Sequence, residues 1–105
     1  MGTCILAAVQ VIARPILRAF AVQHPTARGP LATWFAEAKR AQWKSMAEIR
    51  GRYATASVLN HERVVFNIHG NDFRLVVFIR FKTHCLFIRF IGSHRQYDTI
   101  NALEI

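Results

Sequence analysis

The stretch VVFNIHGNDFRLVVFIRFKTHCLFIRFIGSHRQYD, residues 64–98, decides the fold of this chain. It divides into three apolar segments that are typical of antiparallel β-strands, followed by a short polar segment that is typical of a helix. Arginines interrupt the apolar strands at Arg74, Arg80 and Arg89. Because arginine is seldom placed inside a strand without a reason, these positions indicate a sheet face suited to a polyanion.

The turn at residues 69–72 determines which side chains share a face. It contains Gly-Asn, which suits a hairpin loop, and counting back from it pairs Asn67 with Arg74. The strand period of two then places Arg74 and Arg80 on one face of the sheet. The opposite face of that strand is apolar throughout and should meet the helices: Leu75, Val77, Ile79 and Phe81.

The direction of Arg89 depends on the next hairpin, which turns around residues 82–84. A three-residue loop would place Arg89 beside Val77 in the core, and a four-residue loop would place it beside Phe78. An unpaired buried guanidinium is strongly disfavoured. We therefore predict the second register, in which the three arginines share one exposed face.

The N-terminal part of the chain predicts a strand and two helices. Residues 9–13 are apolar and indicate a short strand. Pro15 suits the first position of a helix that ends near Gln23, because the next residue precedes a proline. A turn over residues 26–29 and a second helix from Pro30 should follow. The second helix carries one apolar stripe, formed by Leu31, Trp34, Phe35 and Ala38.

A capping box, Ser-x-x-Glu at Ser45 to Glu48, predicts a short third helix that ends near Gly51. Residues 53–62 carry only a weak pattern and indicate a loop. The complete order predicts a small single α+β domain over residues 1–105. Its sheet should be rich in antiparallel strands, with the N-terminal helical hairpin on one face and a short C-terminal helix.

The charge of the chain limits the class of partner. Fourteen Lys and Arg against six Asp and Glu give a net charge of +8, which favours a nucleic acid or an acidic protein. No segment is long and apolar enough to span a bilayer, so we expect a cytoplasmic protein without a membrane partner. Cys4 and Cys85 lack the spacing of metal ligands, and we expect free thiols there.

Candidate chemistry lies where the last strand meets the last helix. Ser93 and Gln96 form a second capping box, and His94 and Tyr97 project from one side of that helix. The sequence has no metal-binding motif, no glycine-rich phosphate loop and no paired acid–base carboxylates. A metal-free phosphodiester site remains: RNA supplies its 2′-hydroxyl, arginines stabilise the charge, His94 moves a proton and Tyr97 donates or stacks. A cap or surface role for His94 and a core-edge role for Tyr97 are the structural alternatives.

These residues together resemble the HigB-type toxins, mRNA interferases of the RelE/ParE-like superfamily. The resemblance covers residues 9 to about 101. The segments that carry it are Val-Ile-Ala-x-Pro-Ile-Leu (11–17), Trp34, Ala-x-Trp (41–43), Val-Val-Phe-Asn-Ile-x-Gly-Asn-x-Phe-Arg-Leu (64–75), Phe-Ile-Arg-Phe-Ile (87–91) and His-x-x-Tyr-Asp (94–98).

The resemblance implies a RelE-like toxin of a type II toxin–antitoxin system. Such a toxin cleaves mRNA on the ribosome, inhibits translation, needs no metal or other cofactor, and is neutralised by a helix-turn-helix antitoxin. By position, the catalytic residues would be Arg74, Arg80, Arg89, His94 and Tyr97. The RNA-binding residues would be Lys44, Asn67 and Asn71. Family members usually begin near Val9, so we expect residues 1–8 to be an N-terminal extension.

Two other functions remain open. A toxin of the same fold can act as a binding module that inhibits a DNA-handling enzyme such as gyrase, and such an inhibitor needs no residue that moves a proton. A decayed toxin would retain only RNA or antitoxin binding. The strand arginines and the His-x-x-Tyr pair favour the nuclease.

Overall fold

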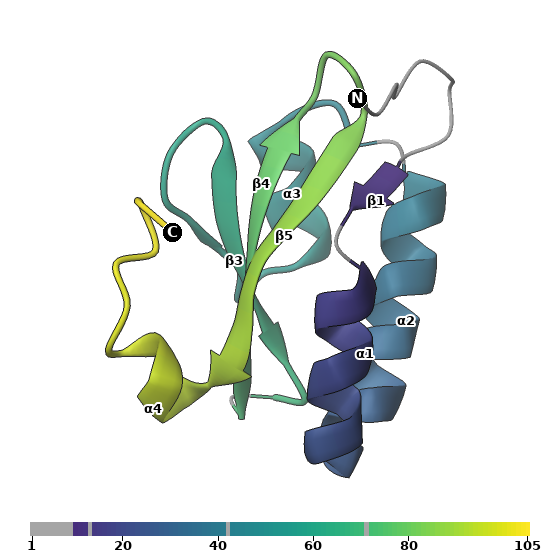
Figure 1. The fold of residues 1–105 in the computed structure, drawn as a ribbon. Helices are drawn as coiled ribbons and strands as arrows, with labels where there is room; N and C mark the ends of the chain where they lie inside the picture. The colour runs from purple at the N-terminus through teal and green to yellow at the C-terminus, as the bar shows by residue number, and fades with distance from the viewer. Residues whose placement is uncertain (1–9, 13, 42, 71) are drawn as a thin grey trace.

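One sheet of five strands runs through the part of the chain that the computed structural model describes, residues 10–12, 14–41, 43–70 and 72–105 (Figure 1). The strands lie in the order β1 (Gln10–Ile12), β5 (Cys85–Ser93), β4 (Phe73–Arg80), β3 (Arg63–Ile68) and β2 (Ser57–Val58). Neighbouring strands are antiparallel except β1, which is parallel to β5. The helices are α1 (Arg14–Gln23), α2 (Pro25–Ala41), α3 (Met46–Arg52) and α4 (His94–Tyr97). The predicted α+β class is confirmed, with a helical hairpin on one face and a short C-terminal helix.

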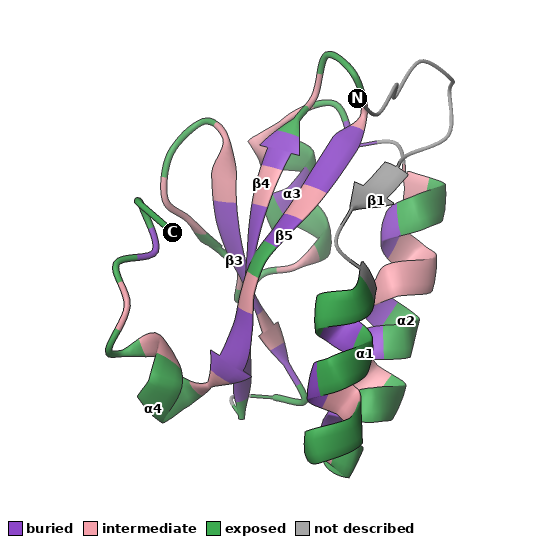
Figure 2. Cartoon of the chain, viewed as in Figure 1, coloured by how far each residue is buried: buried purple, intermediate pink, exposed green. Residues whose placement is uncertain are grey.

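The apolar face of β4 forms the main core together with the N-terminal helices. Leu75, Val77 and Ile79 are buried in one cluster that includes Trp34 of α2. The Trp34 ring packs edge-on against Phe66 of β3, with 5.3 Å between the ring centroids. The sides of α1 and α2 that face away from the sheet are largely exposed (Figure 2). The predicted assignment of the apolar face is therefore confirmed.

The β3–β4 hairpin has the predicted register, in which Asn67 pairs with Arg74. A hydrogen bond of 3.2 Å from the Asp72 N–H to the His69 carbonyl closes the turn. Gly70 has a φ of 65°, in the left-handed region that glycine adopts without strain. The next residue of the turn, Asn71, lies outside the described residues.

The β4–β5 hairpin corrects one prediction. Its loop covers residues 81–84, and Phe78 pairs with Phe87 rather than with Arg89. Arg89 is nevertheless exposed, and its guanidinium lies 5.8 Å from the centroid of the Phe78 ring. Arg89 therefore belongs to the same sheet face as Arg74 and Arg80. This surface of β4 and β5 is called the arginine face below.

The pairing of Phe78 with Phe87 explains why Arg89 lies on the arginine face, because Arg89 is two residues after Phe87 in β5, and a β-bulge follows at this point. Val77 pairs with Ile88 and Val76 pairs with Phe90, so Arg89 is an extra residue of β5 between these two pairs. Ile88 and Ile91 are both buried in the main core although they are three residues apart. A strand with a regular period of two cannot place both on one face, so the bulge follows from the burial of both isoleucines.

Helix α2 begins earlier than predicted. It starts at Pro25, and the turn predicted over residues 26–29 is wrong. Ala27 is fully buried in the main core, which favours helix through this segment. Pro30 is tolerated inside the helix because the carbonyl that it leaves without a donor belongs to Thr26, which is exposed to solvent.

Other differences concern the edges of the sheet. Strand β2 lies in the segment predicted as loop, and it pairs with β3. The strand predicted over residues 9–13 is β1, although its outermost positions lie outside the described residues, as does the predicted extension over residues 1–8. Cys85 is disulfide-bonded, so the expectation that it is a free thiol is wrong.

The C-terminal segment covers part of the arginine face. Ala102 is buried in a second, smaller apolar cluster with Val65 and Val76. The Arg63 guanidinium donates to the carbonyls of Ala102 and Ile105, at 3.2 and 2.5 Å. The middle of this face is thus covered by the chain itself, and its two ends carry the basic side chains.

Glu37 connects α2 to the end of α3. The Tyr53 hydroxyl donates to one carboxylate oxygen of Glu37, and Arg52 forms an ion pair with the other. The hydrogen bond from Tyr53 is the main reason why the pKa of the Glu37 carboxyl is lowered. Burial acts in the opposite direction and raises this pKa, whereas Arg52 lowers it further. Burial, together with the same hydrogen bond, raises the pKa of the Tyr53 hydroxyl.

Tyr53→Phe is expected to lower the free energy of unfolding by about 1–2 kcal/mol at neutral pH, because it removes a hydrogen bond to a charged acceptor. The folded-state pKa of Glu37 is depressed, so its stabilisation is present above the unfolded-state pKa and is lost as the pH falls through the folded-state pKa. The difference between variant and wild type should therefore shrink in acid. Urea unfolding at neutral and acidic pH measures it, and a difference that does not change with pH would assign the loss to packing alone.

Candidate functional site at the end of the sheet

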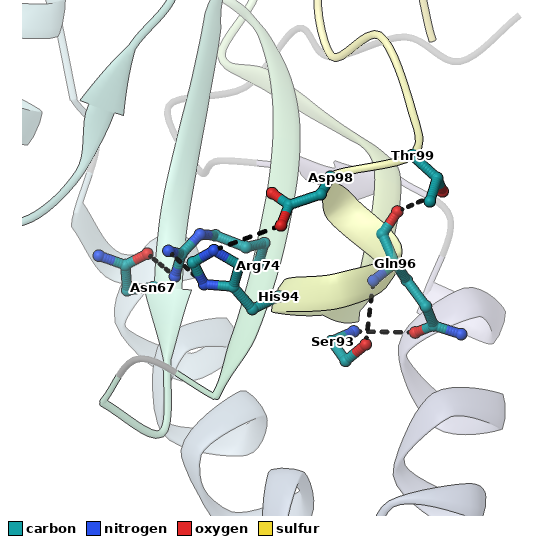
Figure 3. A network of polar contacts seen from close by, with 7 residues as sticks. All are labelled: Asn67, Arg74, Ser93, His94, Gln96, Asp98 and Thr99. Carbon is teal, nitrogen blue, oxygen red and sulfur yellow. Dashed lines mark hydrogen bonds and ion pairs between the residues drawn. The ribbon is translucent and has the colours of Figure 1, made fainter.

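Arg74 is the centre of a polar network at the start of β4 (Figure 3). One guanidinium nitrogen, Nη1, donates to Asn67 Oδ1 at 2.6 Å, across the β3–β4 pair. The other, Nη2, lies 2.9 Å from Nδ1 of His94 at the start of α4. The half-buried guanidinium is therefore held in a defined orientation by groups from two elements.

Local features of the sequence place His94 against Arg74. Ser93 caps α4, because its hydroxyl accepts from the Gln96 N–H at 3.1 Å while Gln96 Oε1 accepts from the Ser93 N–H at 2.8 Å. The His94 N–H donates to the Asp72 carbonyl at 3.2 Å and ties the helix to the β3–β4 turn. A Cβ at Gly92 would lie 2.6 Å from the Phe90 ring and 2.9 Å from Gln96 Oε1, so any other residue here would displace one of these side chains.

The two ring nitrogens of His94 have different neighbours. A guanidinium can only donate, so the contact with Arg74 makes Nδ1 the acceptor and assigns the ring hydrogen to Nε2. Nε2 lies 3.7 Å from Asp98 Oδ2, one turn later in the chain. A carboxylate on that side favours the same tautomer. The side chain of His94 is 49% exposed, so a substrate can reach the ring.

Tyr97 lies on the same side of α4 as His94 and faces the arginine. The centroid of its ring is 6.0 Å from Arg74 Cζ, within the range of a cation–π contact. The ring also packs against Phe90, with 6.5 Å between centroids. Tyr97 is half-buried, so it combines packing on the sheet with access to the site.

The other two arginines predicted as catalytic lie elsewhere on the arginine face. Arg80 and Arg89 both lie with Cζ 5.8 Å from the centroid of the Phe78 ring. Arg80 lies six positions after Arg74 along β4, a distance of roughly 20 Å between their backbones. The structure therefore groups Arg74, His94 and Tyr97 at one end of β4 and the remaining arginines at the other.

The predicted RNA-binding residues are also divided. Asn67 belongs to the network, where it accepts from Arg74 and donates to the Thr55 carbonyl at 3.0 Å. Lys44 is exposed next to Trp43, which packs on the helix-covered side of the sheet. The RNA-binding role predicted for Asn71 stays a prediction, because Asn71 lies outside the described residues.

Sequence reasoning missed Asp98 as a neighbour of the site. Its spacing from His94, four residues on a helix, was the signal that could have found it. Within the described part of the chain, no three His, Cys, Asp or Glu side chains gather as a metal site would need. The described helices include none that is long and apolar enough to cross a membrane.

A separate groove of about 510 Å³ lies between α1 and α2, away from this network. Its lining is mainly apolar, and Arg18 and Arg28 contribute the charge. It contains neither a histidine nor a carboxylate, so it does not offer the chemistry of the network around Arg74.

The fold and the basic sheet face define a class of small α+β proteins suited to an anionic partner. A family model described as HigB toxin, the RelE-like toxic component of a toxin–antitoxin system, matches residues 27–100. The chain belongs to this family and so has an antitoxin as a partner. No curated protein matches the sequence.

Proposed function

We propose that this toxin is an mRNA endoribonuclease whose chemistry is centred on Arg74 and His94. The contact between these two side chains at the end of a basic sheet face is the observation that supports the proposal best. RNA brings its own nucleophile, the 2′-hydroxyl, so the protein has to supply a base, a cation at the phosphate and a donor for the leaving oxygen. The proposed substrate is mRNA on the ribosome in the cytoplasm, and the proposed reaction uses no metal ion.

In the proposed reaction the 2′-oxygen attacks the adjacent phosphorus and the bond from phosphorus to the 5′-oxygen breaks. The substrate phosphate draws the Arg74 guanidinium away from His94, and Nδ1 then accepts the proton of the 2′-hydroxyl. Arg74 donates to the phosphate oxygens as negative charge develops on them. Tyr97 gives a proton to the leaving 5′-oxygen, and afterwards His94 releases its proton to solvent while Tyr97 regains one from solvent. The products are a 2′,3′-cyclic phosphate and a 5′-hydroxyl.

Asp98 and Asn67 support this arrangement. Asp98 on the Nε2 side keeps the hydrogen of the neutral ring there, so that Nδ1 stays the basic nitrogen. Asn67 fixes the other half of the Arg74 guanidinium. We do not place Arg80 and Arg89 in the chemical step, because they lie at the far end of β4.

The antitoxin is proposed to be a helix-turn-helix protein with an acidic surface. A net charge of +8 on the toxin favours an acidic partner through electrostatic complementarity. The same positive charge attracts the RNA backbone, so we expect the antitoxin and the RNA to compete for binding to the toxin.

Induction of the chain in growing bacteria, with 5′ ends of mRNA mapped over minutes, tests the proposal. Wild type should produce new ends within translated frames, and His94→Ala should lose most of them because proton transfer is impaired, an effect of about a hundredfold or more. His61→Ala is the matched control, since His61 is 87% exposed in a loop. Its cleavage pattern should match that of wild type.

Other outcomes have definite meanings. Cleavage that survives His94→Ala would keep the nuclease but move the proton-transfer role to another residue. Growth arrest without new mRNA ends, accompanied by DNA-damage signalling, would replace the nuclease with the gyrase-inhibitor function. Normal growth with intact antitoxin binding would identify a decayed toxin.

A further inference from the structure

Three arginines surround one aromatic ring at the far end of the arginine face. Arg63 of β3, Arg80 of β4 and Arg89 in the bulge of β5 place Cζ within 5.6 to 5.8 Å of the centroid of the Phe78 ring. Phe78 is half-buried, and its ring also packs on Phe87. We call Phe78 with these three arginines the Phe78 cluster. Contacts between guanidinium groups and the ring restrict the arginines, which lowers the entropy lost when they bind a ligand.

The charges of the Phe78 cluster are only partly compensated. Arg63 donates to the carbonyls of Ala102 and Ile105, so it holds the C-terminal segment. Arg80 and Arg89 are exposed, and neither takes part in an ion pair with a carboxylate of the described residues. Like charges collected in this way repel each other, and a bound anion relieves that repulsion.

The position of the cluster indicates which anion it binds. Arg80 and Phe78 lie on the same face of β4 as Arg74, and the strand leads from one group to the other. A guanidinium matches a phosphate with two parallel hydrogen bonds. A single strand of RNA presents a row of phosphates that can reach both ends of the face, whereas the scissile phosphate alone cannot.

We propose that Arg80 and Arg89 form a phosphate-binding subsite for single-stranded RNA, held ready by Phe78 and separate from the chemical site at Arg74. The subsite binds the backbone of nucleotides away from the cleaved bond. It deepens the proposed nuclease function and rests on it for the identity of the strand. The C-terminal segment, held by Arg63, covers Val65 and Val76 between the two groups, so the RNA strand has to pass around this segment.

Binding of a single-stranded RNA hexamer with 2′-methoxy groups, which cannot be cleaved, tests the subsite without relying on catalysis. Titration over a range of salt concentrations gives the affinity and its log–log slope. Arg80→Gln/Arg89→Gln should weaken binding at low salt and reduce the magnitude of the slope by about 1.4, that is about 0.7 for each of two phosphates. Arg18→Gln/Arg50→Gln, which removes the same charge from exposed helical positions, is the matched control and should leave the slope nearly unchanged.

Phe78→Leu keeps an apolar side chain but removes the ring that restrains the arginines. It should weaken RNA binding by roughly twofold to fivefold with the slope unchanged, because the charges remain. Equal slopes for wild type and Arg80→Gln/Arg89→Gln, or equal losses in the Arg18→Gln/Arg50→Gln control, would overturn the subsite. Unchanged RNA binding with lost suppression by the antitoxin would assign the cluster to the protein partner. A normal result in this assay with no mRNA cleavage in cells would keep the subsite and reject the nuclease.

Discussion

Arg74→Ala is expected to reduce mRNA cleavage by roughly a hundredfold to a thousandfold, the usual effect of removing one well-placed donor that stabilises a transition state. In the structure the Arg74 guanidinium lies between Asn67 and His94, so the substitution removes the cation and also releases the imidazole ring. The loss should appear mainly in the maximal rate, because the chemical step is affected more than RNA binding. Mapping of 5′ ends after induction, combined with the RNA hexamer binding assay, separates the two effects.

The control for Arg74 is Arg95, the residue after His94 on α4. Arg95 is exposed on α4 and is not one of the residues of the network drawn in Figure 3. Arg95→Ala removes the same charge as Arg74→Ala but leaves the site residues in place. It should therefore retain cleavage within a few-fold of wild type. Arg74→Ala protein should also melt close to wild type, because its side chain is only half-buried at the rim of the sheet. Full toxicity of a folded Arg74→Ala variant would remove Arg74 from the site.

Leu75→Ala should instead destabilise the fold by about 2–5 kcal/mol, the usual range for a leucine whose removal leaves a cavity. Leu75 is completely buried in the main core, next to Arg74 in the sequence but on the opposite face of β4. The two substitutions thus test the two faces of one strand: the first should affect activity, the second stability. Urea unfolding monitored by tryptophan fluorescence is a suitable measurement, because Trp34 and Trp43 are both in this core.

Leu103→Ala is the matched control for the core substitution. Leu103 is 52% exposed in the C-terminal segment, so its truncation should change the free energy of unfolding by less than about 0.5 kcal/mol. A wild-type unfolding midpoint for Leu75→Ala would mean that the face assignment is inverted.

Much of this architecture follows from local patterns. The period of two over β3 and β4 and the Gly-containing turn predicted the pairing of Asn67 with Arg74, because side chains of a hairpin alternate strictly between faces. Ser93 and Gln96 predicted the start of α4, because a capping box satisfies backbone donors within one turn. These features depend on residues close together in the sequence. The family resemblance added the toxin class, which the match over residues 27–100 supports.

Long-range packing decided the features that the pattern missed. The helix through Pro25 and Pro30 was not foreseen, because both prolines favour a break and only the burial of Ala27 in the core overrides it. The bulge at Arg89 arose in the same way, since two isoleucines three residues apart both had to reach the core. Neither outcome can be read from a local propensity.

The sequence by itself determined strands β3 and β4, their two faces and the residue types of the site, because side-chain periodicity and capping act over a few residues. Only the tertiary structure decided which arginines act together. Arg74 meets His94 because the last helix folds back over the start of β4, and Arg80 and Arg89 meet around Phe78 because β5 pairs with β4 in a register that sets Phe87 opposite Phe78. Distances across a sheet depend on register and bulges, and these are set by how the whole core packs.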